Sequence, residues 1–373
     1  MLIVWWFTIF VAIGDDAPVE KRVSSRTFPS VFQAWHGARA VDGADPVSMQ
    51  AMHDLVFLHP SMVGLQSEAA FEGLAFHFTP AGIAEAKAKR AALLAKNPNL
   101  VLLAEIRYRD APKGFIPEDA PWWKRDSAKN FIIGWPEGGY RMLDVDQPEW
   151  REQVARRAKA VMDTGVFDGI MLDCWIDGEP RLQLVLRLRE AIGNQALVMV
   201  NSNDLPIPLT GPHINGLYME CWRTKSPEDW KRVSETLRWA ETNLRAPRIN
   251  CLETWFEKSR QDLPLMRAVT TLSLTHSNGY CLFADPNELP TSDHLHDWYD
   301  FWNKGLGQPT APGFQRPDQA WERPFSNGNV VYNPAGSAPV TVRFDRPRRS
   351  RASGLMGTEH RVGPNDGDIF LDK

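Results

Sequence analysis

Eight short apolar runs, each followed by a polar residue and a loop, constrain the fold of this 373-residue chain more than any other feature. The runs cover residues 29–35, 54–60, 100–108, 167–175, 196–203, 214–222, 247–255 and 279–285. Helical patterns lie between many of them, at 81–96, 148–164, 181–192, 226–243 and 262–274. Apolar strands that alternate with helices predict a parallel sheet with both faces covered.

Eight such units predict an α/β fold, a (β/α)8 TIM barrel, which we assign to residues 15–308. Its first and last strands should then be neighbours. A doubly wound open sheet is the alternative, but such folds usually place a glycine-rich phosphate loop after the first strand. No such loop follows residues 29–35.

The composition and the residue pattern of the chain change after residue 308. A proline-rich connector, QPTAPGFQRPDQAWERP, is followed by short alternating segments separated by turn residues, with no helical period. We expect residues 309–373 to form a small antiparallel, sandwich-like β lobe, with most of its strands in 320–373. The basic run RPRRS fits a solvated strand edge of that lobe.

The first 14 residues, MLIVWWFTIFVAIG, form an apolar run that is too short to span a bilayer. Ala12 and Gly14 stand at −3 and −1 of a cleavage site before Asp15, which predicts a signal peptide and a secreted or periplasmic protein. The run has no Lys or Arg before it, so a short membrane anchor or a misassigned start remains the alternative. No other stretch is apolar enough to span, and we expect none in the mature chain.

Charge and cysteine usage exclude other classes. A net charge of −4 gives no basic footprint for nucleic acid. The four cysteines are Cys174, Cys221, Cys251 and Cys281; they show no metal-binding spacing and lie in apolar runs, so we expect buried, unpaired thiols. We expect no metal and no other cofactor. The oligomeric state is left open.

Polar side chains at the strand ends give the main functional signal. The carboxyl ends of barrel strands converge on one face, where chemistry takes place. The candidates at these ends are His36, His59, Glu105, Asp173, Asn201, Asn203, Glu220, Glu253 and Asp285. Several convergent carboxylates are costly to bury unless they are paired or used.

Two of these carboxylates fit a catalytic pair. In FDGIMLDCW the pleat of the strand points Asp173 into the barrel mouth and Cys174 away from it, and in LYMECW Glu220 has the same parity. One carboxylate would attack or activate water while the other protonates the leaving oxygen of a glycoside. A separation of about 5 Å would indicate retention of configuration, and about 6.5–9.5 Å inversion. Glu253 and Glu105 are the next candidates for the acid, or would hold sugar hydroxyls.

Tryptophan is over-represented, with 15 residues against 6 Tyr. Trp175, Trp222 and Trp255 each follow a strand-end carboxylate by two residues. The same parity would place them above the acids as an aromatic rim, and indole rings suit the apolar faces of sugars. Packing in a large core is the alternative for each one.

Metal-dependent and serine hydrolases fit less well. A metal site of the amidohydrolase type needs His-x-His after the first strand, and the chain has Trp35-His36-Gly37 there. No GxSxG elbow is present. We therefore expect His36 and His59 to bind substrate hydroxyls or to stabilise a neighbouring carboxylate, with a purely structural role as the alternative.

The segment GVFDGIMLDCW, preceded by YRMLDVDQPEWREQVARRAKAVMD, resembles barrel-type glycoside hydrolases of the hypothetical glycosyl hydrolase family 15 group and, more distantly, endo-alpha-1,4-polygalactosaminidases. The tail RPFSNGNVVYNPAGSAPVTV is similar to the β lobe that often follows such barrels. The resemblance covers residues 28–373. It implies that Asp173 is the nucleophile or base of the fourth strand and that Glu220 is the acid of the sixth.

The chain departs from two related patterns. Chitinase-like enzymes carry DGxDxDxE here, but Met171 and Trp175 occupy the second Asp and the Glu positions. Alpha-amylase-like enzymes place Glu after the fifth strand, where this chain has Asn201 and Asn203. The resulting hypothesis is a secreted glycoside hydrolase that cleaves a poly- or oligosaccharide. The alternatives are a catalytically silent carbohydrate-binding barrel and a metal-dependent hydrolase.

Overall fold

The computed structural model describes residues 17–40, 43–286 and 294–372, so the predicted leader, residues 1–14, lies outside the described residues. All eight apolar runs contain a strand of one parallel sheet in the order β1-β2-β3-β6-β7-β8-β9-β10. A parallel bridge between Val31 and Cys281 joins its two ends, so the barrel closes as predicted. The strands are β1 (Phe32–Ala34), β2 (Leu55–Leu58), β3 (Val101–Glu105), β6 (Gly169–Leu172), β7 (Leu197–Asn201), β8 (Gly216–Cys221), β9 (Cys251–Trp255) and β10 (Tyr280–Ala284).

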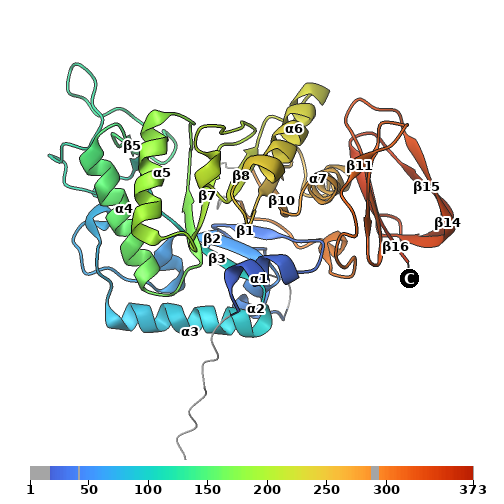
Figure 1. The fold of residues 1–373 in the computed structure, drawn as a ribbon, viewed down its shortest axis with the longest axis horizontal. Helices are drawn as coiled ribbons and strands as arrows, with labels where there is room; N and C mark the ends of the chain where they lie inside the picture. Colours follow the sequence, from blue (N-terminus) through green and yellow to red (C-terminus); the bar gives the residue numbers. More distant parts are fainter. Residues whose placement is uncertain (1–16, 41–42, 287–293, 373) are drawn as a thin grey trace, which may run out of the picture.

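Helices cover the outside of the barrel (Figure 1). Those expected from the sequence are present as α3 (Pro80–Lys96), α4 (Pro148–Asp163), α5 (Glu179–Ile192), α6 (Pro227–Asn243) and α7 (Leu263–His276). The sequence pattern did not predict two short helices, α1 (Val19–Ser25) and α2 (Pro46–Ala51). It also did not predict the short 3-10 turns η1 (Pro60–Val63), η2 (Glu72–Leu74), η3 (Gly211–His213) and η4 (Asp300–Trp302). Helix α6 begins with a capping box between Asp229 and Ser226, and the backbone of Ser226 is extended. This capping box determines where the helix starts.

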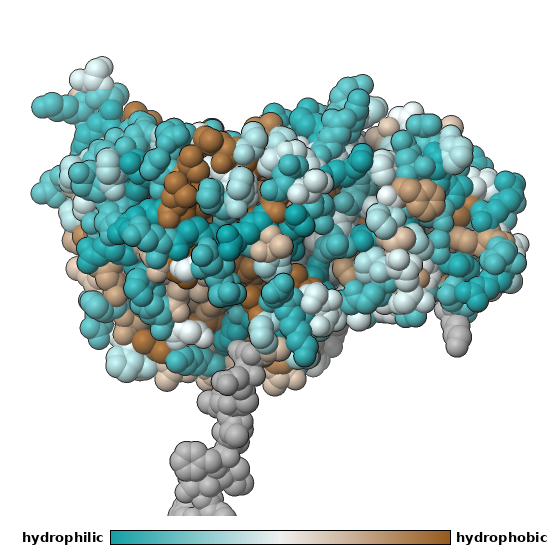
Figure 2. Space-filling view, viewed as in Figure 1, coloured by the Kyte–Doolittle hydropathy of each residue, from teal (hydrophilic) through white to brown (hydrophobic). Residues whose placement is uncertain are grey.

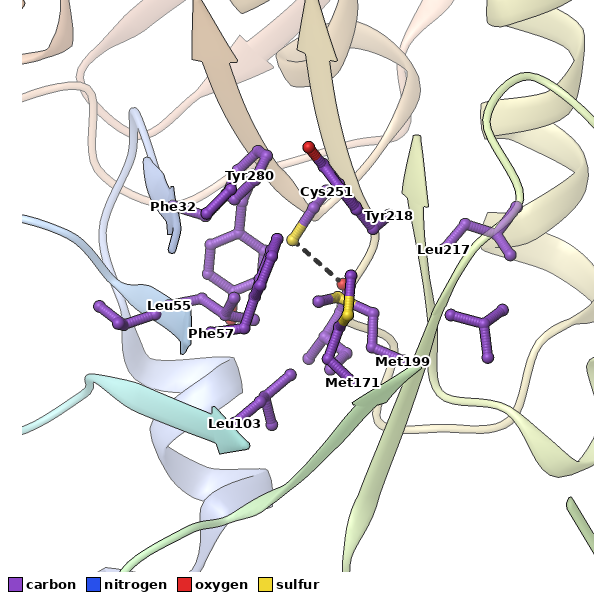
Figure 3. Packing of buried hydrophobic residues seen from close by; sticks show 14 of the residues in the cluster. Phe32, Leu55, Phe57, Leu103, Met171, Met199, Leu217, Tyr218, Cys251 and Tyr280 are labelled. Atoms are coloured by element: carbon purple, nitrogen blue, oxygen red, sulfur yellow. Dashed lines mark hydrogen bonds between the residues drawn. The ribbon is translucent and has the colours of Figure 1, made fainter. Parts of the chain in front are cut away.

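The barrel interior is a packed layer of large side chains. Phe57, Met171, Met199, Tyr218 and Cys251 meet between the strands (Figure 3). The ring centroids of Phe57 and Tyr218 are 5.0 Å apart. On most of these strands the residue two positions further on is polar, so a polar layer lies directly above an apolar one.

The other end of the fourth barrel strand is also fixed. Asp168, which precedes β6, forms ion pairs with Arg22 of α1 and Arg90 of α3 and accepts the backbone N–H of Leu102 at 2.8 Å. Asp168 therefore ties α1, α3 and β3 together beneath the barrel. Asp168 thus lies at the start of this strand, away from the mouth of the barrel.

The C-terminal lobe is one six-stranded antiparallel sheet in the order β11-β12-β13-β16-β14-β15. Its strands are β11 (Phe314–Gln315), β12 (Trp321–Phe325), β13 (Gly328–Asn333), β14 (Val340–Ser350), β15 (Met356–Val362) and β16 (Asp366–Leu371). The register shifts within β14 between Arg343 and Arg348, and a small core of the lobe's own packs Val342 with Val331 and Phe370. The lobe is thus a single sheet with its own small core.

The lobe lies against helix α7 of the barrel (Figure 1). Arg267 of α7 makes two 2.8 Å hydrogen bonds to Asp366, and Gly367 lies so close to α7 that a Cβ there would meet Thr271. The surface in Figure 2 is largely hydrophilic over both parts. No helix among the described residues is long and apolar enough to cross a membrane.

Candidate active site

A cavity of about 580 Å³ opens at the carboxyl ends of the barrel strands. Strand ends supply its floor and the long β3–α4 loop supplies one wall; this loop contains the short strands β4 (Asp110–Ala111) and β5 (Arg141–Met142). The lining residues are Trp35, His36, Met62, Arg107, Arg109, Asp110, Gly134, Trp135, Glu137, Tyr140, Asp173, Cys174, Asn201, Asn203, Glu220, Trp222, Trp255 and His294.

The two carboxylates selected from the sequence meet in this cavity, and one amide joins them. Asn201 Nδ2 donates to Asp173 Oδ1 at 2.8 Å and to Glu220 Oε2 at 2.8 Å. The two acceptor oxygens are therefore at most about 5.6 Å apart, twice that distance. This upper bound lies below the separation of inverting glycosidases, about 6.5–9.5 Å, and is compatible with that of retaining ones, about 5–5.5 Å.

The environment of Glu220 favours its protonated form. Burial raises the pKa of Glu220 to about 8; His294 opposes this rise, and the negative charges of Asp173 and Glu253 add to it. A carboxylic acid with such a pKa keeps its proton at neutral pH. Because Oε2 accepts from Asn201, the proton of Glu220 belongs on Oε1.

Glu253 lies below the cavity and is completely buried. The Tyr218 hydroxyl donates to its Oε2, and His294 Nδ1 lies 2.9 Å from Oε1 and 3.1 Å from Oε2. The other ring nitrogen, Nε2 of His294, lies 3.9 Å from Glu220 Oε1. Glu253 is thus a partner of His294 and does not itself line the cavity.

Glu105 is also buried beneath the cavity rather than in its wall. It accepts from Trp35 Nε1 at 2.9 Å and pairs with Arg107 at 3.1 Å. Trp35 and Arg107 both line the cavity, so Glu105 holds two lining side chains in place. The prediction that Glu105 contacts substrate is wrong in this arrangement, because its carboxylate faces these two partners.

The strand parity inferred at Asp173 fails one residue later. Cys174 has a left-handed backbone with φ of 52°, so the chain turns immediately after Asp173. Cys174 therefore lines the cavity instead of pointing away, and its Sγ lies 3.5 Å from Asp173 Oδ2. Burial raises the pKa of the Cys174 thiol, which keeps it neutral.

The same turn removes Trp175 from the predicted aromatic rim. Trp175 is buried, packs against Tyr108 and donates its Nε1 to Thr210 Oγ1 at 3.1 Å. The assignment of Trp175 to sugar binding is therefore wrong. Trp222 and Trp255 do line the cavity, and Trp222 is 55% exposed at its edge. Trp35 and Trp135 complete the set of indole rings there.

The remaining candidates divide into lining and structural residues. His36 and Asn203 line the cavity, and the Asn203 N–H donates to Asn201 Oδ1 at 3.1 Å. His59 is outside it, because its ring bonds Ser61 Oγ at 2.7 Å and Glu72 at 2.9 Å. The contact with Glu72 fits the expectation that His59 stabilises a neighbouring carboxylate, while the expectation that it binds substrate in this cavity is not met, because His59 is not in its lining.

Asp285 is a second structural residue among the candidates. It is buried between the guanidinium groups of Arg39 and Arg260 and is not in the wall of the cavity. These two partners hold the pKa of Asp285 below its usual range although burial alone would raise it. Its role is to join loops beside β10, which corrects the prediction of a substrate contact.

Several lining residues were not selected from the sequence. Arg109 forms an ion pair with Asp110 at 2.7 Å, and burial raises the pKa of the Asp110 carboxyl group. Trp135 and Tyr140 come from the β3–α4 loop, with ring centroids 5.1 Å apart. In the sequence, the signal for these residues was a long loop rich in aromatic and charged residues.

His294 is a further lining residue that sequence reasoning missed. It stands nine residues after the last predicted strand, in DHLHDW, where no strand pattern marks it. Two histidines in three residues were its only signal. Within the described residues, no group of three His, Cys, Asp or Glu side chains is arranged to hold a metal ion. All four cysteines are free, as predicted.

Comparisons with known proteins agree with this fold. No family model and no curated protein matches the sequence. Among solved structures, the noncanonic maltogenic alpha-amylase AmyB from Thermotoga neapolitana has a TM-score of 0.56 at 11% identity, covering 91% of this chain and 98% of that one. An alpha-amylase from Malbranchea cinnamomea has a TM-score of 0.56 at 12% identity, covering 95% and 97%.

A third similar structure is the cyclic alpha-maltosyl-(1-->6)-maltose hydrolase from Arthrobacter globiformis, with a TM-score of 0.53 at 12% identity, covering 94% of this chain and 98% of that one. At these identities the likeness establishes the fold, a (β/α)8 barrel followed by a β lobe. The chemistry of the site has to be argued from the residues themselves.

Proposed function

We propose that this protein is a secreted, retaining glycoside hydrolase that acts on a poly- or oligosaccharide. The observation that carries the proposal is the pair Asp173 and Glu220, held by one Asn201 amide at a separation of at most about 5.6 Å. Secretion is inferred from the leader in residues 1–14. The similar structures support the proposal, since their names describe two alpha-amylases and a cyclic alpha-maltosyl-(1-->6)-maltose hydrolase.

In the first step Asp173 is the nucleophile. Its Oδ1 accepts the Asn201 amide, and its carboxylate attacks the anomeric carbon of the bound sugar while the glycosidic bond breaks. Glu220 gives its Oε1 proton to the departing oxygen, which leaves as an alcohol. The products of this step are a glycosyl ester on Asp173 and an ionised Glu220.

In the second step Glu220 is the base. A water molecule enters where the leaving group was, Glu220 takes one of its protons, and the oxygen attacks the anomeric carbon. The ester bond breaks, Asp173 returns to its carboxylate form and Glu220 is protonated again. The two inversions at the anomeric carbon give net retention.

The walls of the cavity suit a sugar substrate. Trp222 and Trp255 provide flat apolar surfaces beside the acids, and Asn203, Arg109 and Asp110 provide hydrogen-bonding groups. A cavity of about 580 Å³ is of the size that holds a small ligand or a few sugar units. The same features would serve a catalytically silent binder, so activity decides between them.

The first experiment replaces Asp173 with Asn. The substitution keeps the shape of the side chain and removes its charge, so we expect turnover on an active polysaccharide or aryl glycoside to fall by about three orders of magnitude or more. Asp163→Asn, on the exposed face of α4, is the matched control and should leave turnover unchanged. Full activity in Asp173→Asn would refute the assignment. Binding of sugars without hydrolysis by the unaltered protein would identify a silent carbohydrate-binding barrel.

The second experiment replaces Glu220 with Gln and compares leaving groups. An activated aryl leaving group needs little protonation, whereas a sugar leaving group needs it fully. Glu220→Gln should therefore lose much more activity on oligosaccharides than on activated aryl glycosides, measured as kcat/KM. An equal loss on both substrates would mean that Glu220 is not the acid. Proton NMR of the first product should show the anomeric configuration of the substrate.

A further inference from the structure

His294 has a position that the mechanism above does not use. Its ring lies between two carboxylates, with Nδ1 on buried Glu253 and Nε2 directed to Glu220, 3.9 Å from Oε1. The side chain of His294 is only 2% exposed. A buried imidazole between an inner carboxylate and the proposed acid is placed to act on that acid.

The contacts of Glu253 determine which nitrogen of His294 carries a proton. Glu253 accepts the Tyr218 hydroxyl, and His294 Nδ1 is within hydrogen-bond distance of both carboxylate oxygens. Nδ1 therefore donates to Glu253 in either protonation state of the ring. A second proton, when present, is carried by Nε2, the nitrogen that faces Glu220.

The ring is held rigidly in this orientation. Trp35 stacks on it with ring centroids 5.0 Å apart and 25° between the planes. The backbone carbonyl of His294 accepts from His296 Nδ1 at 3.0 Å. The backbone of His294 is left-handed, with φ of 60°, a conformation that is unfavourable for a residue other than glycine. Such strain persists where the surroundings require one side-chain position.

We propose that His294 is a positioning residue for Glu220: with Nδ1 fixed on Glu253, the proton on Nε2 sets the charge that faces Glu220 Oε1 and so sets the pH range over which Glu220 keeps its proton. The catalytic meaning of this inference rests on the function proposed above. The physical coupling between the two side chains does not depend on it.

The charges around the pair determine the sign of the effect. Glu220 is faced by Asp173 from β6, the Asn201 amide from β7, Glu253 from β9 and His294. Both neighbouring carboxylates raise the pKa of Glu220, whereas His294 lowers it. Removing His294 should therefore make Glu220 hold its proton to higher pH.

Among the described residues, the groups that face His294 include the carboxylates of Glu220 and Glu253, the Tyr218 hydroxyl, the rings of Trp35 and Trp255, and the neighbouring His296. These contacts place the imidazole of His294, a side chain that can carry a positive charge, next to the proposed acid. The negative charges of the carboxylates and the positive charge that His294 can carry thus act along one series of contacts, from Glu253 through His294 to Glu220.

The test follows the carboxyl carbon of Glu220 by NMR in protein labelled with ¹³C-glutamate, with the signal assigned by its loss in Glu220→Gln. In His294→Gln the midpoint of the Glu220 titration should rise by about one to two pH units. His59→Gln, a histidine outside the cavity, should leave the midpoint unchanged. An unchanged or lower midpoint in folded His294→Gln would overturn the inference.

A reciprocal measurement covers the case in which His294→Gln does not fold. Charge coupling acts in both directions, so Glu220→Gln should lower the midpoint of the His294 ring titration, followed by ¹⁵N-histidine NMR. An unchanged His294 midpoint in Glu220→Gln would also overturn the inference.

Kinetics give a third, separate result. If the protein hydrolyses glycosides, the alkaline limb of kcat/KM should move to higher pH in His294→Gln, whereas a merely structural role would lower the rate without moving the limb. Coupled NMR titrations without hydrolysis of any glycoside would refute the proposed function alone. Hydrolysis that depends on Asp173 and Glu220, without the NMR shift, would refute the role of His294 alone.

Discussion

At the scale of single residues, the two carboxylates of the proposed catalytic pair differ in their surroundings. Asp173 and Glu220 share the Asn201 amide, yet their other surroundings differ. Glu220 is largely enclosed, with its side chain 15% exposed, and has a second carboxylate, Glu253, nearby; burial is the largest cause of its raised pKa. Two titratable groups whose surroundings differ in this way suit the proposed roles of nucleophile and acid in one reaction at one pH.

The pH dependence of activity follows from this difference. Glu220 must be protonated to donate, and its pKa is about 8, so kcat/KM should be level at neutral pH and fall about tenfold per unit above pH 8. Assays of an aryl glycoside between pH 5 and pH 10 will show whether this limb exists. Glu220→Gln should lose the limb. A decline of kcat/KM that already begins near pH 5 would contradict the raised pKa.

At the scale of elements, the start of β6 is set by one glycine. Gly169 lies against β7 so closely that a Cβ would come within 2.1 Å of the Leu197 carbonyl oxygen. No side chain fits between these two backbones. The close approach fixes the position of β6 against its neighbour, and β6 ends where Asp173 enters the cavity.

Gly169→Ala should therefore destabilise the barrel. The added methyl group forces β6 and β7 apart, and overpacking of this kind costs about 1–3 kcal/mol of the free energy of unfolding. Urea unfolding followed by circular dichroism measures this loss. Gly363→Ala is the control, because its Cβ would meet no atom within 4 Å. Equal stability of the two variants would contradict the close approach.

At the scale of the whole molecule, the β lobe and the barrel share helix α7. Most residues of α7 from Leu265 to His276 are buried, some by the barrel strands and some by β12, β13 and β16. Arg323 of the lobe is buried and donates to the backbone carbonyls of Leu274, Ser277 and Ala311. We infer that the two parts unfold together.

Arg323→Met tests this joint stability. The substitution removes the Arg323 donors from two buried carbonyl groups, those of Leu274 and Ser277, so we expect the free energy of unfolding to fall by about 3 kcal/mol. Calorimetry should show a single transition in the unaltered chain and a single transition at lower temperature in the variant. Arg343→Met, on the exposed surface of the lobe, should change the Tm little. Two separate transitions in the unaltered chain would show that the lobe unfolds alone.

The fold was largely predictable because the spacing of apolar residues along the chain reflects which residues are buried. Continuous apolar runs separated by amphipathic patterns admit few arrangements, and the closed barrel with its β lobe is one of them. The parity of residues along regular strands likewise placed Asp173, Asn201 and Glu220 at the mouth. These conclusions depend on local geometry, which the order of residues specifies directly.

Tertiary structure decided what parity could not. The left-handed turn at Cys174 exchanged the expected positions of Cys174 and Trp175, and ion pairs with Arg39 and Arg260 took Asp285 out of the site. His294 reaches Glu220 and Glu253 from a loop that has no repeating pattern. The end of a strand determines where a side chain enters the mouth of the barrel. The charged or polar partner that this side chain contacts comes from a distant part of the chain. Only folding brings those partners within the few ångströms over which hydrogen bonds and ion pairs act.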